Sequence, residues 1–181
     1  SALYCDAEAA SSNQRILRTS RAWLEVNKSQ LSEVLVIIQW STWERQEWQD
    51  TDGTYYQVNA SGIDDVPTHW QERYKKFIAE VNWEDCRNHW HDEIWQFHCE
   101  LETKKVKHVF FNGNTSFKGI PNQHIWGNSY IDPYSESQTY DQILKNNGID
   151  TVGPASWHFG KDGHSFWYKF MLQYVIANQL I

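Results

Sequence analysis

The spacing of apolar and polar positions predicts a chain of mixed helices and strands. A stripe of apolar residues at helical spacing predicts a helix over 12–28, and Ser12 and Asn13 are residue types that cap helix starts. A continuous apolar run at 34–40 is typical of a strand buried on both faces, as in a parallel sheet. A second strand is predicted at 106–112. These segments indicate an α/β unit.

Further helices separate and follow the two strands. Apolar residues at helical spacing predict four more helices, over 69–82, 83–105, 135–148 and 162–178. Gly148 is expected to end the third of these, because glycine readily adopts the left-handed conformation that follows many helices. Residues 50–67 are rich in Asp, Gly and Pro and predict a long loop with a small hairpin at Tyr55–Val58.

The order of the elements predicts an α/β fold. Helix, strand, helices, strand and two final helices indicate a three-layer α/β/α sandwich with a short parallel sheet. Two strands are few for so many helices, so a further strand is expected at residues 2–7 and in chain preceding Ser1. We therefore expect a single domain over 1–181 that lacks its first strand. The resulting open sheet edge predicts a homodimer.

Composition narrows the classes of function. The net charge of −7 argues against a nonspecific nucleic-acid binder, which needs a basic face. No run of 18 apolar residues is present, so no membrane span is expected. The three cysteines are an odd number without a CxxC pair and fit a reducing compartment. Eleven tryptophans indicate either a bulky core or an exposed stacking surface, and Trp40, Trp43 and Trp48 are interpreted as packing residues.

Three histidines on the predicted helix 83–105 raise the question of a metal site. His89, His91 and His98 do not have a metalloprotease spacing, and a zinc site needs three or four convergent ligands. His91 and His98 lie about two turns apart, too far to share one ion. The sequence therefore predicts no metal site, and no cofactor is expected.

A family resemblance rests on three stretches that follow one another along the chain, "EAASSNQRILRTSRAWL", "VLVIIQWSTWERQEW" and "SWHFGKDGHSFWYKFMLQYV". Together they resemble the SGNH (GDSL-like) hydrolase superfamily, in particular uncharacterised SGNH-like proteins of marine tailed phages and environmental sequences. The resemblance covers most of residues 4–178 and implies a flavodoxin-like fold. It also implies a serine esterase or deacetylase acting on an acyl ester or acetylated glycan, in the host cytoplasm or associated with the virion.

The resemblance places a catalytic base near the C-terminus. In this family a serine attacks the substrate, a late histidine takes its proton, and an aspartate three residues earlier orients that histidine. His158 matches the base, whereas the position of the aspartate holds Ala155. The nucleophilic serine finds no match and is expected upstream of Ser1. His158 is alternatively a loop histidine that caps the last helix, and His164 is interpreted as structural.

The remaining family positions imply hydrogen-bond donors for an oxyanion or a substrate. They fall on Ser11, Ser12, Asn13, Ser41 and Thr42, and Asn112 ends the second strand on the side where α/β proteins bind ligands. N-capping is the alternative role of Ser11 and Ser12, and turn formation that of Asn112. Arg45 is expected to form a structural ion pair with an acidic residue. The family asparagine at 39–42 is also missing, which favours a second interpretation: a non-catalytic binding or virion-associated module.

Overall fold

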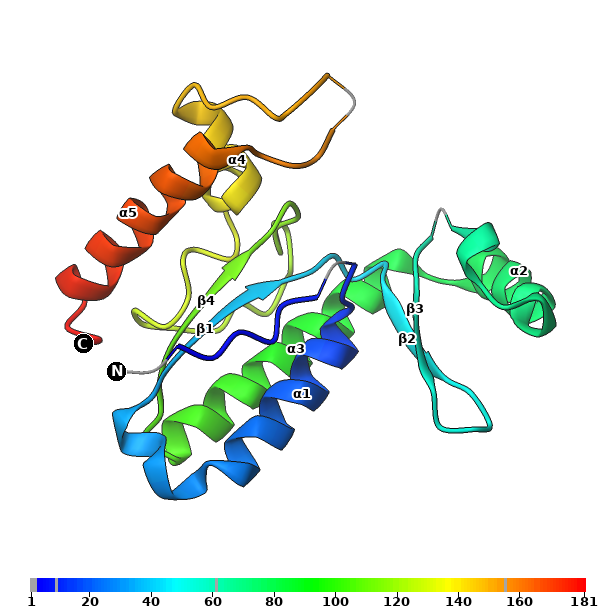
Figure 1. Ribbon diagram of the computed structural model, residues 1–181, viewed down its shortest axis with the longest axis horizontal. Helices are drawn as coiled ribbons and strands as arrows, with labels where there is room; N and C mark the ends of the chain where they lie inside the picture. The colour runs from blue at the N-terminus through cyan, green and yellow to red at the C-terminus, as the bar shows by residue number, and fades with distance from the viewer. Residues whose placement is uncertain (1–2, 9, 61, 155) are drawn as a thin grey trace. The chain divides into compact units, whose positions relative to one another are not determined.

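The chain divides into two compact units. The computed structural model describes residues 3–8, 10–60, 62–154 and 156–181. The first unit comprises 1–29 with 41–97, and the second comprises 30–40 with 98–181. Helices alternate with strands along the chain, which confirms the mixed α/β character (Figure 1). The layered sandwich and the SGNH fold stay predictions.

A capped helix opens the first unit. Helix α1 spans Asn13–Val26, close to the predicted bounds, and the hydroxyl of Ser12 accepts a hydrogen bond from the backbone N–H of Arg15. This bond satisfies one of the N–H groups that a helix start leaves without a partner. The 3₁₀ helix η1, Lys28–Glu33, follows α1. The predicted start of the helix is confirmed by its cap.

A hairpin and a short helix complete the core of the first unit. Strand β2, Gln46–Gln49, pairs antiparallel with β3, Tyr55–Val58, so a hairpin is present, but the predicted segment Tyr55–Val58 is only its second strand and the first lies before the predicted loop. The 3₁₀ helices η2, Ile63–Asp65, and η3, Thr68–Trp70, lead into α2, Gln71–Glu80. The buried core here consists of Trp48, Val58, Val66, Trp70 and Tyr74. Trp48 is thus a packing residue, as the sequence predicts.

Helix α3, Trp83–Thr103, runs from the first unit into the second. Two residues after the helix ends, Lys105 adopts the left-handed conformation, with a φ of 57°. The N–H of Lys105 donates to the carbonyl of Glu102, and the N–H of Val106 donates to that of Leu101. This pair of bonds is the Schellman arrangement that commonly closes helices. It turns the chain directly into the next strand.

A parallel strand pair forms the sheet of the second unit. Strand β1, Leu35–Trp40, pairs with β4, Lys107–Asn112, so that the last residues of the two strands are opposite one another (Figure 1). The strand β4 confirms the strand predicted at 106–112, and it is buried from its second residue onward. Burial of β1 on both faces was the wrong expectation: Ile37 is 50% exposed and Gln39 is exposed. Within the described residues β1 pairs with β4 alone and is a sheet edge.

Two C-terminal helices cover one face of this sheet. After the 3₁₀ helix η4, Glu136–Gln138, helix α4 spans Tyr140–Asn146, and α5 spans Lys161–Ala177. Their side chains pack against alternate residues of β4 in a core made of Val109, Phe111, Ile131, Ile143, Met171 and Val175. Gly148 has a φ of 73° and follows α4, which confirms the predicted helix end.

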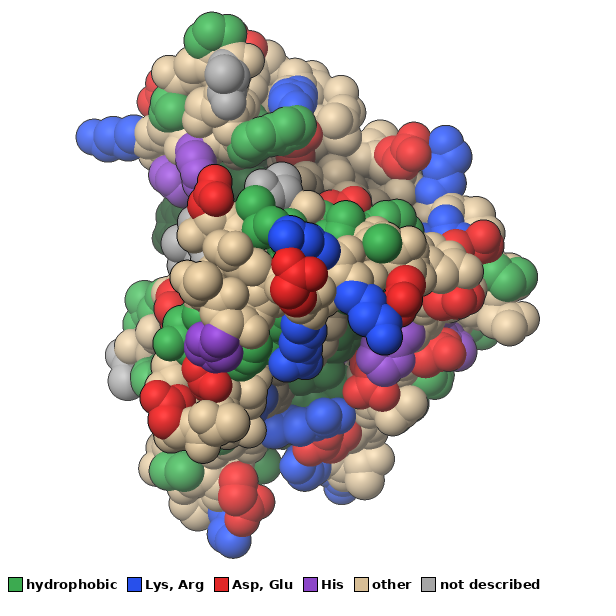
Figure 2. All heavy atoms as spheres, turned by 90° about the vertical axis from the view of Figure 1, so that its right-hand side faces the viewer, with side chains coloured by type: hydrophobic (Ala, Val, Ile, Leu, Met, Phe, Trp, Pro, Cys, Tyr) green, Lys and Arg blue, Asp and Glu red, His purple; other side chains and the backbone are tan. Residues whose placement is uncertain are grey.

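One predicted element is missing from the described chain. Residues 3–8 have no strand structure, so the strand expected at 2–7 was wrong over that range; residue 2 lies outside the described residues. An isolated N-terminal segment becomes a strand only where a partner edge satisfies its backbone groups. The described residues also contain no helix long and apolar enough to cross a membrane. On the face drawn in Figure 2, acidic and basic side chains are interspersed, without an extended single-sign patch among the described residues.

Candidate functional site

Two predicted site segments meet in the first unit. Asn13 is fully buried at the start of α1. Both the oxygen and the nitrogen of its side-chain amide form hydrogen bonds with the backbone of Ser41. The Oδ1 atom accepts from the Ser41 N–H at 2.8 Å, and Nδ2 donates to the Ser41 carbonyl at 3.2 Å. Residues 28 positions apart are thereby held together. We call this pair of bonds the Asn13–Ser41 latch.

Ser11 and Ser12 serve the helix start. The Ser11 hydroxyl donates to the carbonyl of Glu8 at 2.8 Å, and Ser12 caps α1. The backbone N–H of Ser12 donates to Oε1 of Gln57 at 2.8 Å. Both serines are buried. The capping role of Ser12 is confirmed, and their role as oxyanion donors stays a prediction.

The latch places Ser41 beside Arg45, an arginine without an acidic partner among the described residues. Nη1 of Arg45 donates to the Ser41 hydroxyl at 3.0 Å, and the Arg45 N–H donates to the carbonyl of buried Thr42. Burial lowers the pKa of Arg45, and the charge of neighbouring Glu44 only partly opposes this effect. Among the described residues, no carboxylate lies within 4.0 Å of its guanidinium, so the expected ion pair was wrong.

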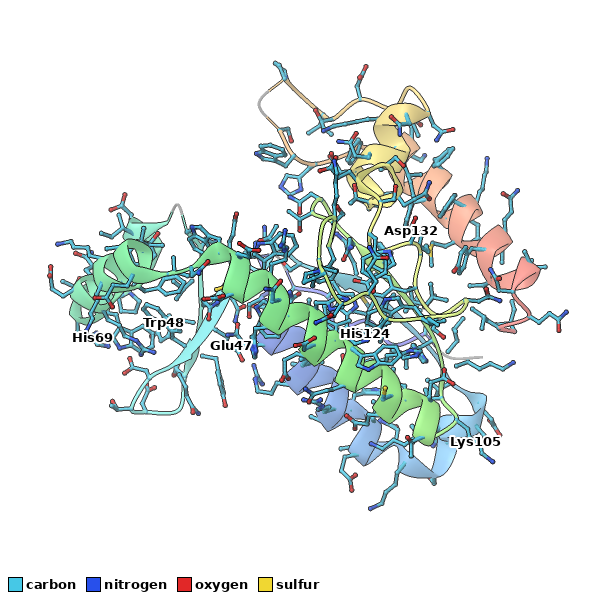
Figure 3. All side chains as sticks on the ribbon, turned by 180° about the vertical axis from the view of Figure 1, so that it is seen from behind. Glu47, Trp48, His69, Lys105, His124 and Asp132 are labelled. Atoms are coloured by element: carbon cyan, nitrogen blue, oxygen red, sulfur yellow. The ribbon has the colours of Figure 1, made fainter. Side chains whose placement is uncertain are left out.

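Glu47 of β2, two residues after Arg45, pairs with a different arginine. Glu47, labelled in Figure 3, is almost buried. Arg18 of α1 donates two hydrogen bonds to its carboxylate, at 2.9 and 2.8 Å. These bonds raise the pKa of Arg18. Nε2 of Gln57 also donates to Glu47. Arg15, on the same helix, pairs with acidic residues of the N-terminal segment. Arg45 thus differs from the two arginines of α1.

In the second unit, Asn112 has a packing role. It is buried at the end of β4, where its Oδ1 accepts from the Tyr130 hydroxyl at 2.6 Å and its Nδ2 donates to the carbonyl of Pro133 at 3.3 Å. Both ends of the amide therefore hold the loop that follows the strand. Burial raises the pKa of Tyr130 well above its usual value, so the phenol stays protonated as the donor. A role of Asn112 in binding substrate stays a prediction.

His158 lies in an exposed loop before α5. Its backbone N–H donates to the Ser156 hydroxyl, and its carbonyl accepts from the N–H of Val152 at 2.8 Å. The side chain is exposed, and no described residue hydrogen-bonds its ring. Ala155, at the position of the family aspartate, lies outside the described residues. His164 lies in the first turn of α5, as predicted.

A buried histidine pair was missed by the sequence analysis. Nδ1 of His98, at the end of α3, lies 2.8 Å from Nε2 of His108 on β4. Glu102, one turn after His98, completes a group whose ligand atoms all lie within 4.8 Å of one another. Burial lowers the pKa of both imidazoles. The signal in the sequence is a His and a Glu four residues apart, followed by a His in the next strand.

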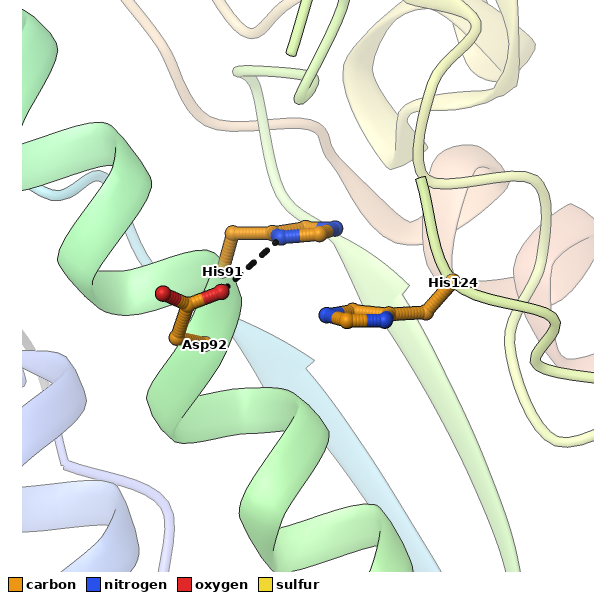
Figure 4. A group of neighbouring side chains, drawn as sticks. All are labelled: His91, Asp92 and His124. Carbon is orange, nitrogen blue, oxygen red and sulfur yellow. Dashed lines mark ion pairs between the residues drawn. The ribbon is translucent and has the colours of Figure 1, made fainter. Parts of the chain in front are cut away.

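Another histidine of α3, His91, forms a second group of this kind with Asp92 and His124. His91 is buried, and its Nδ1 lies 3.6 Å from Oδ1 of the next residue, Asp92, as Figure 4 shows. This contact joins sequence neighbours. His89 is exposed on the same helix. The sequence analysis compared histidines along this one helix and therefore did not consider a partner from β4.

Comparison with known proteins gave no match to a protein-family model, to a curated protein or to a solved structure.

Proposed function

We propose that this chain is a binding module that keeps an SGNH-like fold without a complete catalytic triad. In this proposal its first unit binds an oxoanion, a carboxylate or a phosphate group, at Arg45. The observation that carries the proposal is the half-buried guanidinium of Arg45, whose one hydrogen-bond partner among the described side chains is the neutral hydroxyl of Ser41.

The free energy of the buried charge favours an anionic ligand. A guanidinium stays protonated at neutral pH, and partial burial removes water that would stabilise its charge. A carboxylate or phosphate compensates that loss, because it accepts two parallel hydrogen bonds from the planar guanidinium group. The described residues supply no such group to Arg45, which leaves the other N–H donors of its guanidinium to a ligand or to water.

The surroundings of Arg45 suit the same chemistry. The Asn13–Ser41 latch brings the first residue of α1 to the residue that holds the guanidinium. A helix start carries partial positive charge and attracts anions. The hydroxyl of Ser41 is a further donor at this place. The support therefore comes from a cation, a hydroxyl and a helix start in one unit of the chain.

Titration with inorganic phosphate and with acetate at constant ionic strength tests the proposal. The side-chain N–H signals of Arg45 and the amide signal of Ser41 should shift saturably in NMR spectra with at least one of the probes. Arg45→Gln should weaken binding at least tenfold, whereas Lys76→Gln removes an exposed charge from the same unit and should not change it. The absence of a saturable shift with both probes, or equal binding by Arg45→Gln, would refute the proposal.

We propose a serine esterase as the second candidate, with His158 as its general base. One observation favours it: the ring of His158 is exposed and carries no hydrogen bond from the described residues. An exposed imidazole can reach a substrate and accept the proton of a nucleophile, as a general base must. In this proposal the substrate is an acyl ester or an acetylated glycan.

Hydrolysis of p-nitrophenyl acetate by a chain extended upstream of Ser1, so that it includes the expected nucleophilic serine, tests this second proposal. His158→Ala should reduce the rate at least a hundredfold, because general-base catalysis contributes about 10²–10⁴. The matched control is His164→Ala, which removes another exposed histidine nearby and should leave the rate unchanged. A rate indistinguishable from that of buffer, or full activity of His158→Ala, would exclude the esterase.

A further inference from the structure

We propose that His98, Glu102 and His108 form a binding site for one divalent transition-metal ion, with Zn²⁺ as the preferred ion. The site lies within the second unit and is independent of the proposed anion site. Two imidazoles and one carboxylate are the ligands that zinc takes in sites that keep a fourth, open position. The three ligand atoms already lie within 4.8 Å of one another.

The hydrogen bonds of His108 leave the correct ring nitrogen facing the site. Its Nδ1 lies 2.9 Å from the carbonyl oxygen of Val106, which can only accept. Nδ1 therefore carries the proton, and Nε2 of the neutral ring presents a lone pair. Metal-binding histidines are usually held in this way by a backbone carbonyl on the opposite nitrogen. The lone pair of His108 faces Nδ1 of His98 at 2.8 Å.

Burial keeps both rings in the form that binds metals. His98 is 6% exposed and His108 is 1% exposed. Desolvation is the largest cause of the lowered pKa in each ring, which favours the neutral form. Trp126 packs on His98, and Phe110 packs on His108, with ring centres 5.4 and 4.9 Å apart. These aromatic neighbours limit how far the two imidazoles can rotate away from each other.

Glu102 supplies the negative charge and the access route. Its side chain is 59% exposed, and its Oε1 lies 3.9 Å from Nδ1 of His108, so the carboxylate must turn toward Nε2 of that ring to bind the ion. No Lys or Arg of the described chain pairs with it, whereas the neighbouring Glu100 pairs with Lys104. The carboxylate is therefore available to a cation that enters from solvent. Water supplies the fourth ligand.

Metal binding requires a small rearrangement. In a tetrahedral site with Zn–N distances of about 2.0–2.1 Å, two ligand nitrogens lie about 3.3 Å apart. The His98–His108 pair, now at 2.8 Å, must open by roughly 0.5 Å. The metal replaces the hydrogen bond between the rings: Nδ1 of His98 gives up its proton, and Nε2 of the same ring takes one up. The ring stays neutral and no net proton is released.

Competition with a chromophoric zinc chelator tests the site. The full chain, first treated with EDTA and dialysed, should remove one equivalent of Zn²⁺ from the chelator. Glu102→Gln should weaken binding at least tenfold. The matched control, Glu84→Gln, changes an exposed glutamate at the other end of α3 and should bind as the unaltered chain does. Equal affinity of Glu102→Gln and the unaltered chain would overturn the proposal.

Two spectroscopic measurements identify the metal ligands without replacing either of the buried histidines. Long-range ¹H–¹⁵N spectra of the histidine rings should show His98 changing from the Nδ1–H to the Nε2–H form when Zn²⁺ is added, while His108 keeps its proton on Nδ1. Co²⁺ should give the visible absorption of a tetrahedral nitrogen–oxygen site. Thiolate charge-transfer bands would instead assign the metal to the free cysteines and overturn the proposal, as would unchanged spectra of both rings.

Discussion

Replacement of Asn13 by alanine tests the contact on which the anion site depends. The substitution removes both hydrogen bonds of the Asn13–Ser41 latch from a side chain that is fully buried. It leaves the N–H and the carbonyl of Ser41 without these partners. Because Ser41 itself is half-buried, water can replace part of what is lost. The loss is therefore smaller than for two groups sealed in the core.

The expected cost follows from the two bonds. Each contributes about 1 kcal/mol net, so their removal costs about 2 kcal/mol. Alanine is a better helix former than asparagine by roughly 0.5 kcal/mol, whereas a cavity at a buried position adds a similar cost. We expect the free energy of unfolding to fall by about 2 kcal/mol. For a chain of this size, that corresponds to a melting temperature lower by about 4–8 °C.

A second variant separates the two bonds. Asn13→Asp keeps an oxygen that accepts from the Ser41 N–H but places another oxygen against the Ser41 carbonyl. An acid in the first turn of α1 also gains about 0.3–1 kcal/mol from the helix dipole. Asn13→Asp should therefore lie between the unaltered chain and Asn13→Ala.

Urea unfolding and hydrogen exchange together measure this effect. Unfolding followed by circular dichroism gives the change in free energy, and exchange of the Ser41 amide reports on the latch itself. The amide should lose protection in Asn13→Ala and retain it in Asn13→Asp. If Asn13→Ala stays within 0.5 kcal/mol of the unaltered chain and the Ser41 amide keeps its protection, the latch does not stabilise the fold.

Two further predictions concern packing and thiol chemistry. Gly163→Ala should destabilise the protein by about 1–3 kcal/mol, because the added Cβ would lie 2.6 Å from Cβ of Phe159. This cost exceeds the roughly 1 kcal/mol by which alanine favours a helix over glycine. Thermal unfolding checks this, with Gly153→Ala as a control whose added Cβ meets no atom within 4 Å. Burial, and then the charge of Asp85, raise the pKa of Cys86, so iodoacetamide at pH 8 should modify it more slowly than in the urea-unfolded chain. Mass spectrometry of the alkylated peptide gives both rates; they should converge as the pH rises, and equal rates at pH 8 would contradict the prediction.

The elements that the sequence predicted correctly are those with local causes. The start of α1 depends on the Ser12 cap, and the end of α4 depends on Gly148, which adopts the conformation that other residues avoid. Strand β4 has a buried apolar run that needs no knowledge of its partner. These signals are contained in a few neighbouring residues, and they were read within two or three residues of the observed bounds.

The errors concern positions that depend on distant partners. The apolar run of β1 resembles that of β4. Ile37 is nevertheless half exposed, because β1 is an edge strand of the sheet that the described residues form. Arg45 was expected to pair with an acid, but Glu47 is already held by Arg18 from a helix 29 residues earlier. The tertiary structure decides which arginine forms an ion pair with a given acidic residue. Spacing along the chain carries no information on it.

The histidine pair shows how a short chain reversal creates a site that periodicity does not reveal. A search along one helix finds ligands three or four residues apart, and of this site it finds His98 with Glu102 but not the third ligand. The third ligand arrives because Lys105 adopts a left-handed conformation, which ends α3 and returns the chain beside its own last turn. For a residue with a Cβ that conformation costs about 1–2 kcal/mol, which the two Schellman bonds and the burial of the following strand must offset. The same turn fixes Val106, whose carbonyl holds the proton on His108, and so one backbone reversal sets both the position and the tautomer of the ligand. Lys105→Gly would relieve that strain while keeping the turn, and should therefore stabilise the protein without weakening zinc binding, whereas a β-branched residue at 105 should weaken both.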